Sequence, residues 1–238
     1  MPFILNCLTV LILASQDYYL LQILYRKGEI METELDSKLE WSYSAKNTAE
    51  LQQKYDDWAV EYDQLTEDGI GWIGPHKTIE YLKKYVLDKD SSILDAGAGT
   101  GFVGEILKTE EYKNIVGVDI SEGMMNVALK KNAYKQYHLM DLTQKLNFEN
   151  ELFDAVIVVG VFTHGHVGPE ILDNIIPVMK RGGYLVFTIR QDFYESSDFE
   201  KKMNAYLKNQ IVLVEKSDLY QAFKSSPVLH HIEVYQAI

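Results

Sequence analysis

The stretch SSILDAGAGTGFVGEILK (residues 91–108) joins an apolar pair to an aspartate and then to three glycines at alternate positions. An apolar run before a glycine turn, followed by an amphipathic segment, is typical of a β-strand, a tight loop and the start of an α-helix. The backbone N–H groups of such a loop can approach a ligand closely. The stretch therefore predicts a ligand site on a strand, loop and helix unit.

Two registers fit the glycine loop. Residues 99–104 (GTGFVG) fit the dinucleotide pattern G-x-G-x-x-G, whereas residues 95–101 (DAGAGTG) place a carboxylate at the end of the strand. That carboxylate, Asp95, would repel a pyrophosphate and attract a ligand with an ammonium or sulfonium group, and S-adenosylmethionine carries both. An Asp before glycines is also a common cap of a turn, so the loop alone leaves both ligands open.

Two more carboxylates follow apolar runs. Asp119 ends IVGVD and Asp141 follows YHLM. Asp119 can accept hydrogen bonds from both hydroxyls of a ribose, which NAD and S-adenosylmethionine share. Asp141 can accept a hydrogen bond from an adenine amino group. We expect these acids to lie at one edge of a sheet, beside an adenosine-type ligand.

Short runs rich in Val and Ile alternate with helical patterns from residue 48 onward. Expected helices cover residues 48–65, 75–86, 102–109, 121–132 and 168–180, and expected strands cover residues 93–94, 115–118, 137–140, 155–159, 184–189, 211–214 and 231–235. This order predicts an α/β fold, a Rossmann-like doubly wound sheet that is mostly parallel with helices on both faces. The break at residues 225–227 favours an antiparallel pair at the end. We expect an N-terminal extension over residues 1–47 and one domain over residues 48–238.

The charge and the cysteine content indicate which partners and which cellular compartment to expect. The net charge is −12, with carboxylates concentrated between residues 28 and 68 and no stripe of Lys or Arg, which disfavours nucleic acid. Cys7 is the only cysteine, which excludes an intramolecular disulfide and fits the cytoplasm.

The apolar stretch FILNCLTVLILAS (residues 3–15) has no Lys or Arg before it and is too short for a stable membrane span. We expect a docked amphipathic helix there, with secretion or membrane association as the open alternative.

Five motifs occur in order: ILDAGAGTG, IVGVDISEGMMNVA, HLMDL, FDAVIVVGVF and VMKRGGYLVFTIR. Together they resemble those of the class I S-adenosylmethionine-dependent methyltransferase superfamily, over residues 50–238. YDDWAVEYD, GVFTHGHV and EVYQAI resemble, more narrowly, the methyltransferase-like protein 27 group, also called the Williams-Beuren region methyltransferase-like proteins. The resemblance implies a seven-stranded sheet with a reversed last strand and S-adenosyl-L-methionine as cofactor.

The resemblance also implies roles for particular residues around the cofactor. The methionine part would be surrounded by Asp95, Gly97, Gly99 and Gly101, the ribose held by Asp119, and the adenine met by Ile120, Met124, Asp141 and Leu142. Gly160 and Val161 would border the side where the methyl group leaves. Tyr55 and Tyr62 would lie on a helix that closes over the cofactor, where Trp58 is explained equally well by packing.

The acceptor is left open between a small molecule and a protein side chain. After the fourth strand the chain reads VGVF (residues 159–162), unlike the Asn/Asp-Pro-Pro-aromatic motif of methyltransferases that act on nucleobase amines. His164 and His166 could take a proton from an acceptor, or they could only shape the turn. Two histidines one residue apart make half a metal site at best, so no metal is expected. A non-catalytic S-adenosylmethionine-binding partner protein and an NAD-dependent oxidoreductase are the alternatives.

Overall fold

The computed structural model describes residues 37–69, 71–207, 209–223 and 227–238. The apolar stretch 3–15, Cys7 and residues 28–36 of the acidic segment lie outside these residues. Within them, no helix combines the length and the apolar character needed to cross a membrane.

A single mixed sheet forms the centre of the molecule. Its strands are β1 (Ser92–Ala96), β2 (Asn114–Asp119), β3 (Gln136–Leu139), β4 (Phe153–Phe162), β5 (Met179–Arg190), β6 (Ile211–Lys216), β7 (Tyr220–Gln221) and β8 (Leu229–Ala237). The order across the sheet is β3-β2-β1-β4-β5-β8-β6, and β7 pairs with β8. The first five strands are parallel, and β8 runs antiparallel to β5, β6 and β7. The predicted doubly wound sheet with a reversed last strand is therefore confirmed.

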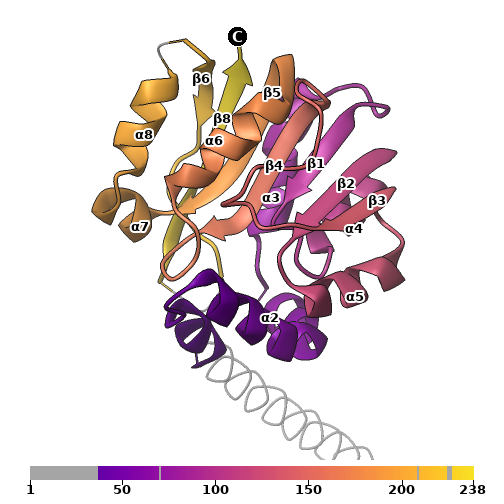
Figure 1. Cartoon of the computed structure of the whole chain (residues 1–238), viewed down its shortest axis with the longest axis vertical. Coiled ribbons are helices and arrows are strands. Elements are labelled where there is room, and N and C mark those ends of the chain that lie inside the picture. Colours follow the sequence, from indigo (N-terminus) through magenta and orange to yellow (C-terminus); the bar gives the residue numbers. More distant parts are fainter. Residues whose placement is uncertain (1–36, 70, 208, 224–226) are drawn as a thin grey trace, which may run out of the picture.

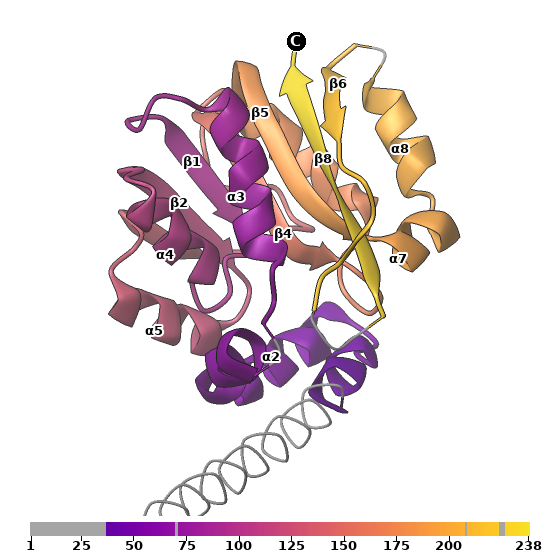
Figure 2. The ribbon, with the colours of Figure 1, turned by 180° about the vertical axis from the view of Figure 1, so that it is seen from behind.

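Helices lie on both faces of this sheet and across one end of it. They are α2 (Thr48–Asp63), α3 (Gly74–Tyr85), α4 (Phe102–Thr109), α5 (Glu122–Lys131), α6 (Leu172–Ile175), α7 (Gln191–Ser196) and α8 (Phe199–Tyr206). Figure 1 shows α6 in front of the sheet and α8 beside its β6 edge, and the opposite view in Figure 2 shows α3 and α4 in front of the other face. Right-handed crossovers between parallel strands produce this placement.

The alternation of side chains along the strands divides the core into two layers. Ile93 packs with the layer beneath α3 and α4, whereas the next residue, Leu94, packs with the layer beneath α6 and α8. Ile157 and Val158 of β4 divide in the same way. Burying such a side chain stabilises the fold by roughly 1.5–3 kcal/mol. The unbroken apolar runs of the central strands follow from burial on both faces.

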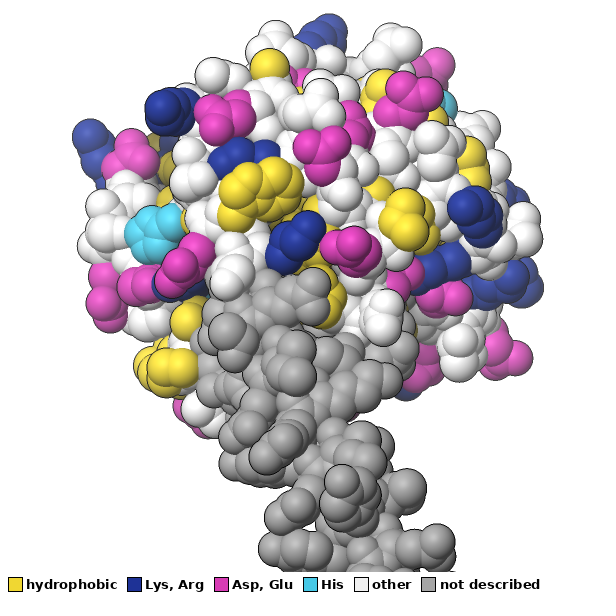
Figure 3. Space-filling model, turned by 90° about the horizontal axis from the view of Figure 1, so that it is seen from below, with side chains coloured by type: hydrophobic (Ala, Val, Ile, Leu, Met, Phe, Trp, Pro, Cys, Tyr) yellow, Lys and Arg dark blue, Asp and Glu magenta, His cyan; other side chains and the backbone are white. Residues whose placement is uncertain are grey.

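Helix α2 lies apart from the two layers, across the end of the sheet where the parallel strands finish (Figure 1). The side chain of Asn47 caps it by accepting a hydrogen bond from the backbone N–H of Glu50. Trp58, on the buried side, is fully enclosed and packs with Ala222 and Phe223. Figure 3 views the molecule from this end, where acidic and basic side chains are interspersed with a few hydrophobic ones.

Three expectations need correction. The helix expected over residues 168–180 is broken into a 3₁₀ turn (Pro169–Ile171), the short α6 and a second 3₁₀ turn (Ile176–Val178), because Pro177 lacks a backbone N–H donor. The sheet has eight strands rather than seven, since the two-residue β7 pairs with the start of β8. Helices α7 and α8 were not predicted.

Candidate functional site

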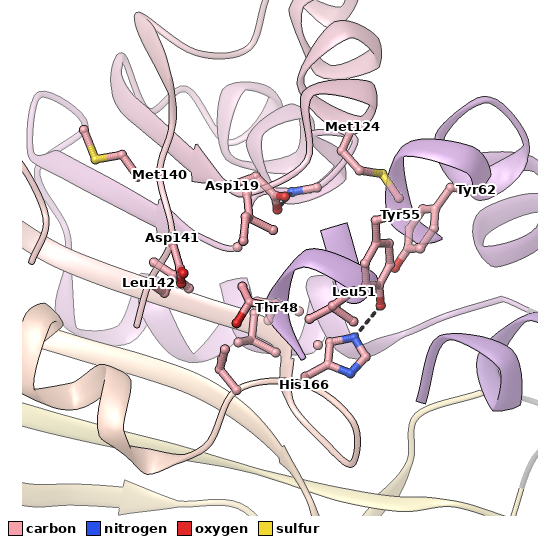
Figure 4. Close-up of a pocket in the computed structure, with 17 residues that line it drawn as sticks. Thr48, Leu51, Tyr55, Tyr62, Asp119, Met124, Met140, Asp141, Leu142 and His166 are labelled. Atoms are coloured by element: carbon pink, nitrogen blue, oxygen red, sulfur yellow. Dashed lines mark hydrogen bonds between the residues drawn. The ribbon is translucent and has the colours of Figure 1, made fainter. Parts of the chain in front are cut away.

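A cavity lies between α2 and the carboxyl ends of the parallel strands. This is the place where open α/β sheets bind ligands. Figure 4 shows Asp119 and Asp141 at strand ends on one side of the cavity, with Tyr55 and Tyr62 of α2 on another. The predicted residues that line it are Tyr55, Tyr62, Gly97, Gly99, Asp119, Ile120, Met124, Asp141, Leu142, Gly160, Val161 and His166.

The glycine loop forms one wall. Gly97 has φ +84°, and a Cβ atom there would come within 2.4 Å of Cγ2 of Val161. Gly99 has φ +53°, and a Cβ atom there would meet nothing within 4 Å. The Tyr137 hydroxyl donates to the Gly99 carbonyl at 2.8 Å, which holds the loop from behind. Glycine is thus needed at 97 for space as well as for its backbone angle, and open space remains beside 99 for a ligand.

Asp119 joins the loop to the next helix. Its Oδ2 accepts from the Gly99 N–H at 2.8 Å, and its Oδ1 accepts from the Ser121 N–H at 2.9 Å. Burial raises the pKa of Asp119, and these two backbone donors oppose that shift. A carboxylate has about four acceptor positions, so each oxygen keeps capacity for one ligand hydroxyl. This geometry fits a ribose with two adjacent hydroxyls.

Asp141 and three apolar side chains form the wall next to Asp119. Oδ1 of Asp141 accepts from the backbone N–H and the hydroxyl of Thr143, at 2.8 and 2.7 Å. Met124 and Leu142 are buried and Ile120 is half-buried. Apolar walls with one carboxylate at the edge fit a flat base that bears an amino group.

Helix α2 is fastened over the cavity by its carboxylates. Oδ1 of Asp56 accepts from the Ser121 hydroxyl at 2.6 Å and from the Gly123 N–H at 2.8 Å. At the end of the helix, Asp63 accepts a hydrogen bond from the Thr100 hydroxyl of the glycine loop and pairs with Lys131 at 2.8 Å. The helix therefore contacts the same two segments that form the walls of the cavity.

A tyrosine and a histidine that line the cavity are hydrogen-bonded to each other. The Tyr55 hydroxyl is hydrogen-bonded to Nε2 of His166, as the dashed line in Figure 4 marks. Nδ1 of His166 lies 3.1 Å from the carbonyl oxygen of His164 and must donate to it, so Nε2 is the acceptor for Tyr55 in the neutral ring. Burial lowers the pKa of His166 to about 4 and raises that of Tyr55.

Two residues of the glycine loop lie outside the cavity lining. Asp95 is fully buried: its Oδ2 accepts from the Tyr134 hydroxyl at 2.7 Å, its Oδ1 has no hydrogen-bond partner, and burial raises its pKa to about 7. Gly101 has φ +87°, and a Cβ atom there would lie 3.1 Å from Ala128. The structure thus places Asp95 behind the loop and Gly101 against α5, and their contact with a ligand stays a prediction.

His164 points away from the cavity. Its Nε2 lies 3.5 Å from Oδ1 of Asp192, with much of both side chains in solvent. Of the two candidate histidines, only His166 lines the site. Among the described residues, no group of three or more His, Cys, Asp or Glu side chains could hold a metal ion.

Some lining residues were not assigned to the site from the sequence. They are Thr48, Leu51, Met140, Val159 and Val167. Leu51 lies on the same helical stripe as Tyr55, and Met140 directly precedes Asp141. Both residues could therefore have been predicted from their positions next to residues already assigned to the site. Val167 lies on the irregular segment after β4, for which periodicity gives no signal.

The chain is similar in sequence to known methyltransferases. Residues 94–187 match the family model of a methyltransferase domain. The chain is 29% identical over 191 residues to human methyltransferase-like protein 27, covering 78% of this chain and 75% of that protein. It is 32% identical over 157 residues to a demethylmenaquinone methyltransferase of Bacteroides fragilis, covering 61% of this chain and 62% of that protein.

The fold also matches a solved structure. A TehB-like S-adenosylmethionine-dependent methyltransferase from Corynebacterium glutamicum superposes with a TM-score of 0.58 at 17% identity, covering 78% of this chain and 99% of that one. This similarity concerns the arrangement of the sheet and its helices.

Proposed function

We propose that this chain is a class I S-adenosylmethionine-dependent methyltransferase that transfers the cofactor's methyl group to a small molecule. The observation that carries the proposal is the position of the cavity, which α2 covers at the carboxyl ends of the strands. A covered cavity suits an acceptor that can be enclosed, whereas a protein side chain must reach in from a folded surface.

We assign the cofactor to the cavity as follows. Gly97 and Gly99 border the methionine part, Asp119 accepts from the ribose hydroxyls, and Asp141 accepts from the adenine amino group. Ile120, Met124 and Leu142 pack around the base. The open space beside Gly99 and the remaining acceptor positions of Asp119 support this assignment.

When bound, the cofactor supplies a methyl group on a positively charged sulfur, which is reactive without an activating metal. The chain's own task is to align the acceptor and to exclude water. Asp56 and Asp63 hold α2 over the cavity and serve the second purpose. Tyr55 and Tyr62 of α2 line the cavity, where their aromatic rings would favour the cationic sulfur.

The relatives give this proposal partial support. The Bacteroides fragilis protein is named for demethylmenaquinone, a small molecule, and the chain spans less than two thirds of its length.

The test uses S-adenosylmethionine labelled with a deuterated methyl group. The protein is incubated with a small-molecule extract and, separately, with a protein extract, and mass spectrometry finds the label. We expect labelled products in the small-molecule extract and none with the Asp119→Ala variant. Label confined to proteins would contradict a small-molecule acceptor, and no label in either extract would favour a non-catalytic binding protein.

We also propose a cytoplasmic setting and no nucleic-acid partner. A single cysteine and a net charge of −12 support this. The mixture of both charge signs around α2 in Figure 3 is consistent with an acceptor that is not drawn in by long-range charge.

A further inference from the structure

A second, smaller cavity adjoins the cofactor cavity. The two share a wall formed by Tyr55, Tyr62, Gly160 and His166. A Cβ atom at Gly160 would lie 2.9 Å from the Trp72 ring, so glycine lets that ring approach the end of β4. The second cavity therefore begins where the methyl group would leave the first.

The walls of the second cavity are aromatic and uncharged. Tyr43, Trp72, Phe162 and Phe223 line it, and Trp72 stacks on Phe223 with ring centres 6.2 Å apart. Of its described lining residues, none is Asp, Glu, Lys or Arg. Burial lowers the pKa of His230 to about 4, so this side chain is neutral near pH 7. Such a cavity favours a flat, neutral ring.

Three polar atoms on the lining residues are buried without a hydrogen-bond partner. They are Nε1 of Trp72, Oγ1 of Thr163 and Nδ1 of His230. Thr163 and His230 are only 5% and 7% exposed, so solvent does not satisfy them. Buried polar groups are normally paired, and a ligand oxygen can supply the pairing that the protein lacks.

We propose that the second cavity is the acceptor subsite, that it takes a neutral phenol carrying a second oxygen, and that Tyr55 and His166 receive the proton of the phenol. The inference rests on the proposed function, because the cofactor must occupy the adjoining cavity. It goes further in naming the acceptor class and the groups that act on it.

The transfer balances as follows. The phenol oxygen bonds to the methyl carbon as the carbon–sulfur bond breaks, and the electron pair of that bond stays on sulfur, which becomes a neutral thioether. The phenol proton passes to the Tyr55 oxygen while the proton of Tyr55 passes to Nε2 of His166. One positive charge is present on sulfur before the step and on the imidazole after it.

The geometry explains why a weakly basic histidine is adequate. The oxygen of the phenol becomes strongly acidic as its bond to the methyl group forms, so proton transfer during that step is downhill. Burial keeps His166 unprotonated near pH 7, and its Nε2 already accepts from Tyr55. An ammonium acceptor would instead place a second cation beside the sulfur, in a cavity without a lining carboxylate.

The binding test compares three para-substituted phenols of similar size by calorimetry, in the presence of S-adenosylhomocysteine. We expect 4-hydroxyacetophenone, which is neutral, to bind at least tenfold more tightly than 4-hydroxybenzylamine or 4-hydroxybenzoate. Thr163→Val should weaken its binding severalfold. Tighter binding of either charged probe, or no binding of the neutral one while S-adenosylmethionine binds, would overturn the inference and leave the proposed function standing. Absence of S-adenosylmethionine binding would instead overturn the proposed function.

The proton-transfer test uses Tyr55→Phe and His166→Gln with labelled S-adenosylmethionine and 4-hydroxyacetophenone. Both variants should bind cofactor and probe within a few-fold of the wild type, yet transfer the methyl group about 100-fold more slowly, as loss of a general base predicts. His76→Gln, an exposed histidine on α3, should behave like the wild type. Transfer at the wild-type rate by both Tyr55→Phe and His166→Gln would overturn the assigned roles.

Discussion

Two independent constraints require a glycine at position 97. It has φ +84°, which costs other L-residues roughly 1–2 kcal/mol, and a Cβ atom would come within 2.4 Å of Val161. Gly182 has a similar φ of +77° but open space around it. Comparing substitutions at these two glycines therefore separates the energetic cost of the positive φ angle from the cost of steric crowding.

We expect Gly97→Ala to lower the free energy of unfolding by about 2–5 kcal/mol, and Gly182→Ala by only about 1–2 kcal/mol, because overpacking adds about 1–3 kcal/mol. Urea denaturation measures both. Adding Val161→Ala to Gly97→Ala should restore part of the loss. Equal losses for the two glycine variants would show that the loop relaxes around the methyl group.

At this scale the sequence identified most lining residues but gave no sign of the contacts behind the glycine loop. Asp95 is fully buried there and burial raises its pKa to about 7, while its contact with the ligand stays a prediction. Its partner is Tyr134, and the space for that ring comes from Gly104, where a Cβ atom would lie 2.4 Å from the ring. Such pairings join residues far apart in sequence, so no local pattern reveals them.

Helix α2 is the element that completes the site. Gly123 meets it so closely that a Cβ atom would lie 2.8 Å from Cα of Asp56. Asp56 accepts hydrogen bonds from Ser121 and Gly123 there, whereas its neighbour Asp57 is exposed and accepts only a side-chain hydrogen bond from Gln53 among those described.

Removing the hydrogen bonds to Asp56 should loosen the contact of α2 with the rest of the site. We expect Asp56→Ala to weaken S-adenosylmethionine binding about tenfold, equivalent to about 1.4 kcal/mol, and to speed hydrogen exchange in α2. Asp57→Ala is the matched control and should change neither. If both variants bind like the wild type, α2 does not depend on Asp56 to stay closed.

Among the elements, periodicity predicted α2, α4 and α5 to within about two residues, because their apolar stripes are regular. The prediction of one helix over residues 168–180, after β4, was wrong for a physical reason. Its apolar residues pack on the sheet from short 3₁₀ and α turns, so their spacing imitates one longer helix until Pro177 ends it.

At the scale of the whole molecule, a buried polar cluster fixes the antiparallel edge of the sheet. Glu233 of β8 is 2% exposed and accepts from the Tyr235 hydroxyl at 2.6 Å, Lys216 at 2.8 Å and His231 at 3.1 Å. Burial opposes its charge, yet the hydrogen bonds from His231, Lys216 and Tyr235 lower its pKa below the ordinary value. The cluster joins β8 to β6 and, through His231 and Gln191, to α7.

The lowered pKa sets the sign of a pH dependence. A carboxyl group with a lower pKa in the folded state stabilises the fold above its unfolded pKa of about 4.3, and that contribution is lost as the pH falls through the folded value. We expect Glu233→Gln to cost about 3–5 kcal/mol at pH 7 and less below pH 4. Thermal unfolding between pH 3 and 7 measures this, with the exposed Glu149→Gln as control. A cost independent of pH would contradict the charge-based account.

Sequence reasoning recovered the overall architecture because the alternation of buried runs and helices is a property of the whole chain. It could not supply the second cavity. That space is enclosed by residues from widely separated segments, such as Tyr43, Trp72, Phe162 and His230, which only the folded chain brings together.

The central claim is that the cavity between α2 and the glycine loop holds S-adenosylmethionine. Titration calorimetry with S-adenosylmethionine and NAD, on the wild type and Asp119→Ala, tests it most directly. We predict that the wild type binds S-adenosylmethionine but not NAD. In the variant, the binding free energy of S-adenosylmethionine should weaken by about 1.5–3 kcal/mol for each lost hydrogen bond to the carboxylate. Tight binding of NAD with no response to S-adenosylmethionine would contradict the account.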